Sequence, residues 1–135
     1  MSITAEQVCD DLIELLDFVK HRMLELAEYQ GLTRMQIFGL YILDRYPDIG
    51  MSHMAEVLHC DASNVTGIIE RLVQQDLVSR HEDEKDRRIK KITVTKKGKL
   101  VINKVMANLP KILGCDKLSA AERISLHSAI QKLGV

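Results

Sequence analysis

Two short amphipathic segments separated by a tight turn constrain the fold of this chain most strongly. In the first, Ser52 is placed to cap a short helix whose apolar residues face one way. After His59 and Cys60, Asp61 is placed to cap a second helix, in which apolar residues recur at spacings of three and four. The inward positions are Met54, Ala55, Leu58, Val65, Ile68, Ile69, Leu72 and Val73. Two such helices joined by a tight turn predict a helix-turn-helix.

Two short apolar runs follow, at 77–81 and 89–94, with a charged loop between them. Their length and alternation predict the two strands of a hairpin, with Ile92 and Val94 facing inward and Lys91 and Thr93 facing outward. A helix-turn-helix followed by a hairpin predicts a winged helix-turn-helix, a mainly α fold with a small β-hairpin.

A long helix is predicted before this unit, from Thr4 to Tyr29, and Gly31 is expected to end it. Its apolar residues recur at spacings of four and three, the pattern of a helix that packs along another helix; they are Leu12, Leu16, Val19, Met23 and Leu26. Its other faces are rich in acidic residues. Thr33 and Gln36 then form a capping box for a helix that runs to about Arg45.

Two further helices are predicted after the hairpin. Thr95 is placed to cap the first, and Pro110 should end it within about a turn. Ser119 and Glu122 form a capping box for the last helix, which includes Ile130 and Leu133 among its apolar residues.

Charge is distributed unevenly along the chain. The segment 78–99 carries nine Lys and Arg against four Asp and Glu, a local charge of +5, while the whole chain sums to zero. Counterion release at phosphates depends on a local basic surface, so this segment is a candidate nucleic-acid contact. A solvated charged hairpin is the alternative, and the acidic run 82–84 is expected to be solvated surface.

The composition restricts the remaining possibilities. A chain of 135 residues is expected to form one folding unit, and no 18-residue apolar run or secretory leader is evident. Three widely spaced cysteines fit a reducing compartment, so the cytoplasm is expected. The five histidines lack metal-ligand spacing, and no catalytic triad or phosphate-cradling glycine loop is evident, so neither an enzyme, a metal nor a cofactor is expected.

Several short motifs occur together, in order, between about Leu32 and Gly98. They are Leu32-Thr33-x-x-Gln36, Ala55-Glu56-x-Leu58, Asn64-Val65-Thr66, Arg71-Leu72, Asp76-Leu77-Val78-x-Arg80, Asp86-Arg87-Arg88 and Val94-Thr95-x-x-Gly98. In this combination the chain resembles the MarR family, the multiple-antibiotic-resistance regulators. The flanking helices match that family in pattern only.

The resemblance implies a transcriptional regulator, expected to be a repressor, that binds a pseudo-palindromic operator in double-stranded DNA as a homodimer. It implies an N-terminal dimerisation helix (1–31), a winged helix-turn-helix domain (32–99) and C-terminal dimerisation helices (100–135) in a bacterial or archaeal cytoplasm, at the nucleoid. The expected dimer-interface residues are Leu12, Leu16, Val19, Ile130 and Leu133. In a monomer, the chain's own C-terminal helices would have to cover the apolar stripe instead.

In this family the wing Asp orients an Arg that enters the minor groove, which implies these roles for Asp86 and Arg88, with Arg87 sharing the duty. On the recognition helix Asn64 is the best base reader, since its amide pairs in bidentate fashion with adenine. Arg71 and Arg80 are expected on the DNA backbone or in an internal ion pair. The full set of expected DNA contacts is Ser52, Ser63, Asn64, Thr66, Gly67, Arg71, Arg80, Asp86, Arg87, Arg88 and Lys90.

The resemblance leaves the controlling signal open. Many relatives are released from DNA by a small aromatic or phenolic effector, and others by thiol oxidation or zinc. Cys9 lies on the first helix, where oxidant-sensing relatives keep their reactive thiol, but without evident tyrosine-rich surroundings; Cys60 is expected to be a packing residue. The alternative function is a winged-helix module for protein contacts or for non-specific DNA packaging.

Overall fold

The computed structural model describes residues 1–135 and contains six α-helices, a short 3-10 turn and a two-stranded hairpin. In chain order these are α1 (Ala5–Tyr29), α2 (Arg34–Arg45), α3 (Met51–Leu58), α4 (Ala62–Gln74), β1 (Val78–Glu82), β2 (Lys90–Val94), α5 (Lys96–Ile112), the 3-10 turn (Cys115–Lys117) and α6 (Ala120–Lys132). The predicted mainly α fold with a winged helix-turn-helix is confirmed.

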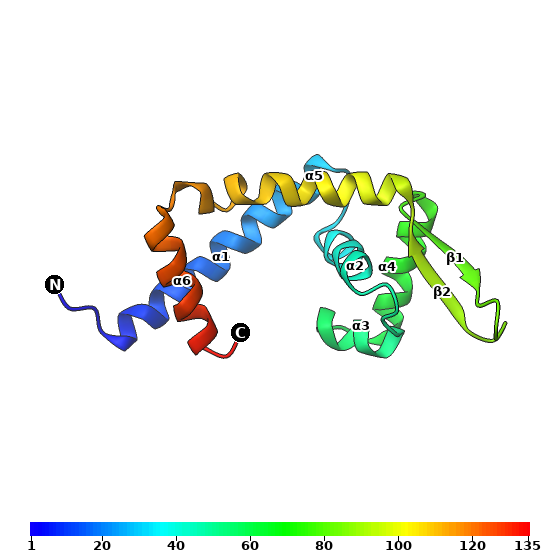
Figure 1. Ribbon diagram of the computed structural model, residues 1–135, viewed down its shortest axis with the longest axis horizontal. Coiled ribbons are helices and arrows are strands. Elements are labelled where there is room, and N and C mark those ends of the chain that lie inside the picture. The colour runs from blue at the N-terminus through cyan, green and yellow to red at the C-terminus, as the bar shows by residue number, and fades with distance from the viewer.

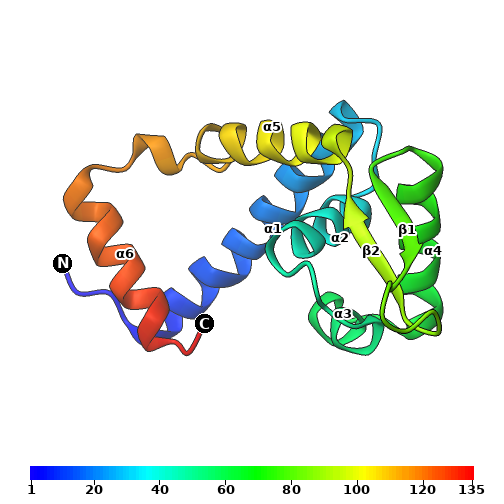
Figure 2. The same cartoon turned by 45° about the vertical axis from the view of Figure 1, so that its right-hand side comes forward.

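The helices α2, α3 and α4 and the hairpin form one end of the molecule (Figure 1). From there α5 crosses to the other end, where α6 turns back toward the first half of α1 (Figures 1 and 2). We call α1, α5 and α6 the helical frame. None of the helices combines the length and apolar composition needed to cross a membrane.

Local side-chain caps explain most helix boundaries. Thr33 and Gln36 form the predicted capping box, with the Thr33 amide donating to Gln36 Oε1 at 2.8 Å and the Gln36 amide donating to Thr33 Oγ1 at 3.1 Å. Ser119 and Glu122 form the second predicted box, and Thr4 and Gln7 form one that the sequence analysis missed. Pro110 lies two residues before the end of α5, as expected.

The predicted cap at Ser52 is wrong. The N-cap of α3 is Gly50, which has extended backbone angles of φ −77° and ψ 157° and no side-chain cap, so Ser52 lies inside the first turn. Burial explains the earlier start, because the helix is anchored by Met54 and Leu58, which face the core whether or not a hydroxyl caps the helix.

The hairpin is antiparallel. Strand β1 begins and ends one residue later than predicted, and β2 begins one residue later but ends where predicted. Val78 pairs with Val94, Arg80 with Ile92 and Glu82 with Lys90. Ile92 and Val94 pack against the core, as expected, and Lys91 and Thr93 are exposed.

The core contains seventeen buried apolar residues, and the helical frame contributes to it only in part. From α1 it takes Met23, Leu26 and Ala27, and from α5 it takes Ile102 and Val105. No residue of α1 before Met23 and no residue of α6 is buried. The winged half of the chain therefore has its own core, while much of the frame remains uncovered.

A close approach at Gly98 joins the wing to α5. A Cβ atom at this position would overlap the carbonyl oxygen of Leu77 and would lie 2.9 Å from Val94 Cγ1. Gly67, in the middle of α4, differs, because a Cβ atom there would meet nothing within 4 Å. Glycine is thus required by packing at position 98 and not at position 67.

We expect Gly98→Ala to lower the free energy of unfolding by about 1–3 kcal/mol, because the added methyl group forces the backbone of the junction apart. Gly67→Ala is the matched control and should raise that free energy by up to about 1 kcal/mol through helix propensity. Urea denaturation followed by circular dichroism measures both. A Gly98→Ala variant as stable as the wild type would contradict the close approach.

Candidate nucleic-acid interface

The amphipathic helix α4 supplies one half of the candidate interface. Its inner side is fixed by Val65, Ile69 and Leu72, which are fully buried in the core. Its start is fixed by Asp61, which accepts hydrogen bonds from the Asn64 amide and from Ser63 Oγ, both at 2.8 Å. These bonds, the Asn64 amide first, lower the pKa of Asp61. The opposite side of α4 faces outward on a rigid support.

The predicted contact residues on α4 differ in how free their side chains are. Ser63 Oγ donates to Asp61, and Thr66 Oγ1 donates to the Ala62 carbonyl at 3.0 Å, so both hydroxyl hydrogens are used inside the helix. The exposed side-chain amide of Asn64 makes no hydrogen bond within the chain, whereas its backbone amide donates to Asp61. The exposed Arg71 guanidinium has no carboxylate within ion-pair distance. Gly67 lies on the same side between them. Asn64 and Arg71 are therefore free to bind a ligand.

The wing supplies the other half through a fork between Asp86 and Arg88. Arg88 Nε donates to Asp86 Oδ1 at 3.1 Å and Arg88 Nη2 donates to Asp86 Oδ2 at 3.0 Å, while the Arg88 amide also donates to Oδ1. The Arg88 side chain is nevertheless 91% exposed. Asp86 therefore holds the guanidinium in one orientation without covering it.

Asp83 braces the same loop, and its predicted role as solvated surface is wrong. Its side chain is only 17% exposed, because it accepts from the Lys85 amide at 2.7 Å and pairs with Lys91 at 3.5 Å. The Lys85 hydrogen bond first, and the Lys91 charge after it, lower the pKa of Asp83. Asp83 and Asp86 are thus partly buried in the loop, while Glu84, Arg87, Arg88 and Lys90 are exposed.

The remaining predicted residues lie apart from these two groups. Arg80 is exposed on β1 without an ion-pair partner, and Ser52 is exposed in the first turn of α3. Cys9 is exposed on α1, and Cys60 is half-buried in the turn before α4. No group of three His, Cys, Asp or Glu side chains lies close enough together to hold a metal ion.

An apolar cavity of about 280 Å³ lies between the frame and the winged half. All ten of its lining residues are hydrophobic, and they come from α1, α2, α5 and the residue that follows α5: Val19, Met23, Ile37, Phe38, Tyr41, Ile102, Val105, Met106, Leu109 and Leu113. Sequence reasoning did not find it, because its walls come from three helices that are distant in the chain.

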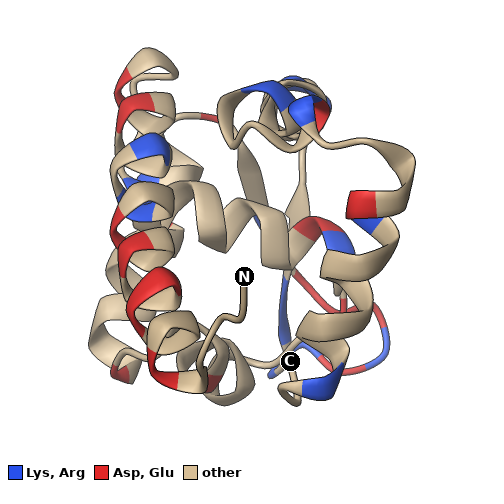
Figure 3. Cartoon of the chain, turned by 90° about the vertical axis from the view of Figure 1, so that its left-hand side faces the viewer, with Lys and Arg blue, Asp and Glu red and all other residues tan.

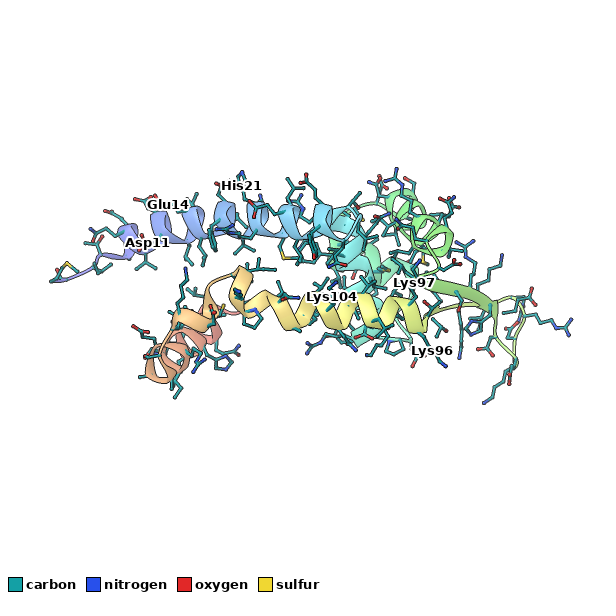
Figure 4. The ribbon with its side chains drawn as sticks, turned by 90° about the horizontal axis from the view of Figure 1, so that it is seen from above. Asp11, Glu14, His21, Lys96, Lys97 and Lys104 are labelled. Carbon is teal, nitrogen blue, oxygen red and sulfur yellow. The ribbon has the colours of Figure 1, made fainter.

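Acidic side chains are most concentrated on α1, and basic side chains are most concentrated in the segment 78–99. Figure 3 shows acidic positions along α1, and Figure 4 shows Asp11 and Glu14 near the start of that helix. Lys96 and Lys97 lie at the start of α5, beside the hairpin (Figure 4). The basic surface is thus concentrated around the wing.

The Asp86–Arg88 fork predicts an unusual titration. Hydrogen bonds from Arg88, its side chain first, lower the pKa of Asp86 from its ordinary 3.8 and raise the pKa of Arg88. An NMR titration of the carboxyl carbon should therefore find Asp86 below 3.8, and Arg88→Ala should return it toward that value. Asp83, which has other partners, is the control and should keep its lowered pKa.

The sign of the pH effect follows from this direction. Because the folded pKa of Asp86 lies below the unfolded one, the fork stabilises the wing above the unfolded pKa and loses this effect as pH falls through the folded pKa. An Asp86 that titrates at the ordinary value in the wild type would show that the fork does not persist in solution.

Comparisons with known proteins agree with this geometry. Residues 32–90, from the residue before the α2 capping box to the first residue of β2, match the MarR family model. The chain is 32% identical over 114 residues to the HTH-type transcriptional repressor MdtR of Bacillus subtilis, covering 82% of this chain and 74% of the relative. It is 30% identical over 108 residues to the organic hydroperoxide resistance transcriptional regulator of the same organism, covering 80% and 74%. The crystal structure of YusO from Bacillus subtilis superposes with a TM-score of 0.72 at 29% identity, covering 98% of each chain.

Proposed function

This chain belongs to the MarR family of DNA-binding transcriptional regulators, and from this premise we propose that it is a repressor that binds a pseudo-palindromic operator as a homodimer. Its curated relatives are regulators and not enzymes. The observation that carries the proposal combines two surfaces. The outer side of α4 presents the free side chains of Asn64 and Arg71, and the wing presents the Arg88 guanidinium, which Asp86 orients but does not cover. A repressor of this kind acts on the chromosome, which implies the cytoplasm.

Each half of the interface suits one groove of DNA. In the proposed complex α4 enters the major groove, where Asn64 reads adenine through a bidentate amide contact. Arg88 enters the minor groove, whose narrow A·T-rich stretches concentrate negative potential and attract a weakly hydrated guanidinium. Arg71, Arg80, Arg87 and Lys90 contact phosphates and set the register.

The wing contact is tested first. We expect Arg88→Ala to weaken operator binding by about 1–3 kcal/mol. Arg88→Lys should weaken it as well, because an ammonium keeps the charge but loses the planar fork with Asp86. The measurement is a fluorescence-anisotropy titration against DNA from upstream of the protein's own gene, at fixed salt with excess random competitor.

Two outcomes would count against the proposal. A folded, dimeric Arg88→Ala variant with unchanged affinity would remove Arg88 from the interface. A sequence-specific regulator should retain a preference of ~10³ or more over random DNA. Wild-type binding that competitor DNA erases would favour non-specific packaging, and no binding would favour a protein-contact module.

The uncovered part of the frame supports the dimer. Leu12, Leu16 and Leu133 are 41%, 55% and 60% exposed, and Val19 and Ile130 are half-buried. Such a large exposed apolar surface is unusual for a monomer. Because α6 does not cover the first half of α1 within one chain, we assign both to the interface with a second copy, with 32–99 as the DNA-binding domain between the flanking segments 1–31 and 100–135.

We expect Leu16→Glu to give monomers or unfolded chain. The dimer contains two copies of this side chain, each worth about 1.5–3 kcal/mol when buried, and a carboxylate there would also have to be desolvated. Glu14→Lys, on the acidic side of α1, is the control and should stay dimeric. Light scattering after size-exclusion chromatography measures both masses, and a Leu16→Glu variant that is still dimeric would place the interface elsewhere.

Two signals are candidates for release from DNA. The apolar cavity supports a small aromatic or phenolic effector, because it lies between the frame and the winged half and carries no charged lining. The same anisotropy assay with salicylate as the probe tests this route. Oxidation of the exposed Cys9 is the second route, and it is tested by adding cumene hydroperoxide to the wild type and to Cys9→Ser.

A further inference from the structure

A second hollow of about 450 Å³ lies beside α4, and we call it the α2–α4 groove. One wall is the first turn of α2, the floor includes Cys60, and the other wall is the outer side of α4. Its lining residues are Thr33, Met35, Gln36, Cys60, Ser63, Asn64, Gly67, Ile68 and Arg71. None of them is acidic, and the one charged residue is Arg71.

We propose that the α2–α4 groove receives the sugar-phosphate backbone of one operator strand, an inference that rests on the proposed function and deepens it. The groove is continuous with the outward face of α4, so a duplex that engages Asn64 brings a phosphate strand to its opening. The opposite wall belongs to α2, which has not been assigned a DNA contact above.

The charge distribution in the groove fits a phosphate. Arg71 has no carboxylate within ion-pair distance, so its guanidinium is available to an anion. The first turn of α2 borders the groove, and helix N-termini carry partial positive charge, whereas the N-terminus of α4 is already capped by the Asp61 carboxylate. Two positive contributions, Arg71 and the start of α2, therefore converge on a groove that no acidic side chain lines.

Gln36 provides an independent observation. It is only 4% exposed and lines the groove, and its Oε1 is committed to the Thr33 amide at 2.8 Å. Its Nε2 makes no hydrogen bond to a protein acceptor and is not sealed from solvent. The side-chain amide nitrogen of a buried glutamine that lines the groove thus has no acceptor within the protein, and a phosphate oxygen in the groove would supply one.

The proposed phosphate contact in the α2–α4 groove, which we call the phosphate seat, has a consequence for recognition. A backbone contact carries no base information, but it fixes how deeply and at what angle the recognition helix enters the major groove. With the wing on one flank of α4 and the α2 wall on the other, the helix is positioned from both sides before Asn64 reads a base.

Met35 allows the groove to be tested without altering a predicted DNA contact. Its half-buried side chain lies on the α2 wall, in the first turn of that helix. Met35→Gln is the neutral reference for Met35→Glu and Met35→Lys. Relative to this reference, Met35→Lys should make the slope of log affinity against log salt concentration steeper by about one. Met35→Glu should weaken operator binding at least about tenfold at low salt.

Stability and long-range charge are controlled separately. Met35 packs against the core, so all three variants lose this packing and are compared with one another, and circular dichroism confirms that each is folded. A carboxylate in the first turn of a helix favours folding, which makes Met35→Glu no less stable than Met35→Lys on this account. The same three substitutions at Leu100 on α5, which is 71% exposed, control for net charge. Since α5 lies across the winged half from α3 (Figure 1), the Leu100 variants should bind alike.

Alkylation of Cys60 gives a second readout on the unmodified wild-type chain. Bound operator should slow its reaction with iodoacetamide at least about fivefold, as quantified by mass spectrometry, because a strand in the groove covers the floor. Cys115, exposed between α5 and α6, is the internal control and should react at the same rate with and without DNA.

The outcomes separate this inference from the proposed function. Graded binding by the Met35 variants together with protection of Cys60 would support the phosphate seat. Equal binding by the three variants, or an unprotected Cys60, while the wild type still binds its operator would overturn the seat alone. Failure of the wild type to bind any upstream DNA would overturn the proposed function and the seat with it.

Discussion

The junction between the end of α4, the start of β1 and the first turn of α5 is the constraint on which the interface depends. Thr95 donates its amide to the Leu77 carbonyl at 3.0 Å and its hydroxyl to the Asp76 carbonyl at 2.6 Å, while Lys97 Nζ donates to the Gln75 carbonyl at 3.0 Å. Three consecutive carbonyls after the recognition helix are thus held by two residues at the start of α5, Thr95 and Lys97. The absence of a side chain at Gly98 lets the two backbones approach this closely.

This junction makes the recognition helix, the wing and α5 move together. A further tie, the Lys99–Asp44 ion pair at 2.6 Å, joins α5 to α2. In the proposed dimer, the angle at which α5 leaves the winged half sets the distance between the two α4 helices, and that distance has to match one turn of the duplex. The apolar cavity lies between α5, α2 and α1, so an occupant that shifts α1 against α5 changes the spacing without touching DNA.

The sequence predicts those features that depend on neighbouring residues. The caps at Thr33, Asp61, Thr95 and Ser119 each join a side chain to a backbone amide three residues away, so their residue types are sufficient evidence. The start of α3 was mispredicted because burial and backbone conformation, and not a hydroxyl, determine it. The cavity and the α2–α4 groove were missed because their walls meet only after the tertiary fold brings separate helices together. The sequence predicts the pairing of Asp86 with Arg88. It does not predict that Asp83 is partly buried, because an acid that stabilises a loop and an acid that is solvated can have the same neighbours in sequence.

A neutral chain can still be strongly polarised, and this one is. Helix α1 contains seven acidic against two basic residues, a charge of −5, which balances the +5 of segment 78–99. The start of α1 and the wing are separated along the molecule (Figure 4), and salt screens exposed charges over about 10 Å, so these two groups of charges act on DNA largely independently. The acidic helix α1 repels the duplex while the wing attracts it, which favours encounters in which α4 and Arg88 already face the grooves. The neutral isoelectric point therefore reflects a division of charge between an acidic first helix and a basic wing segment.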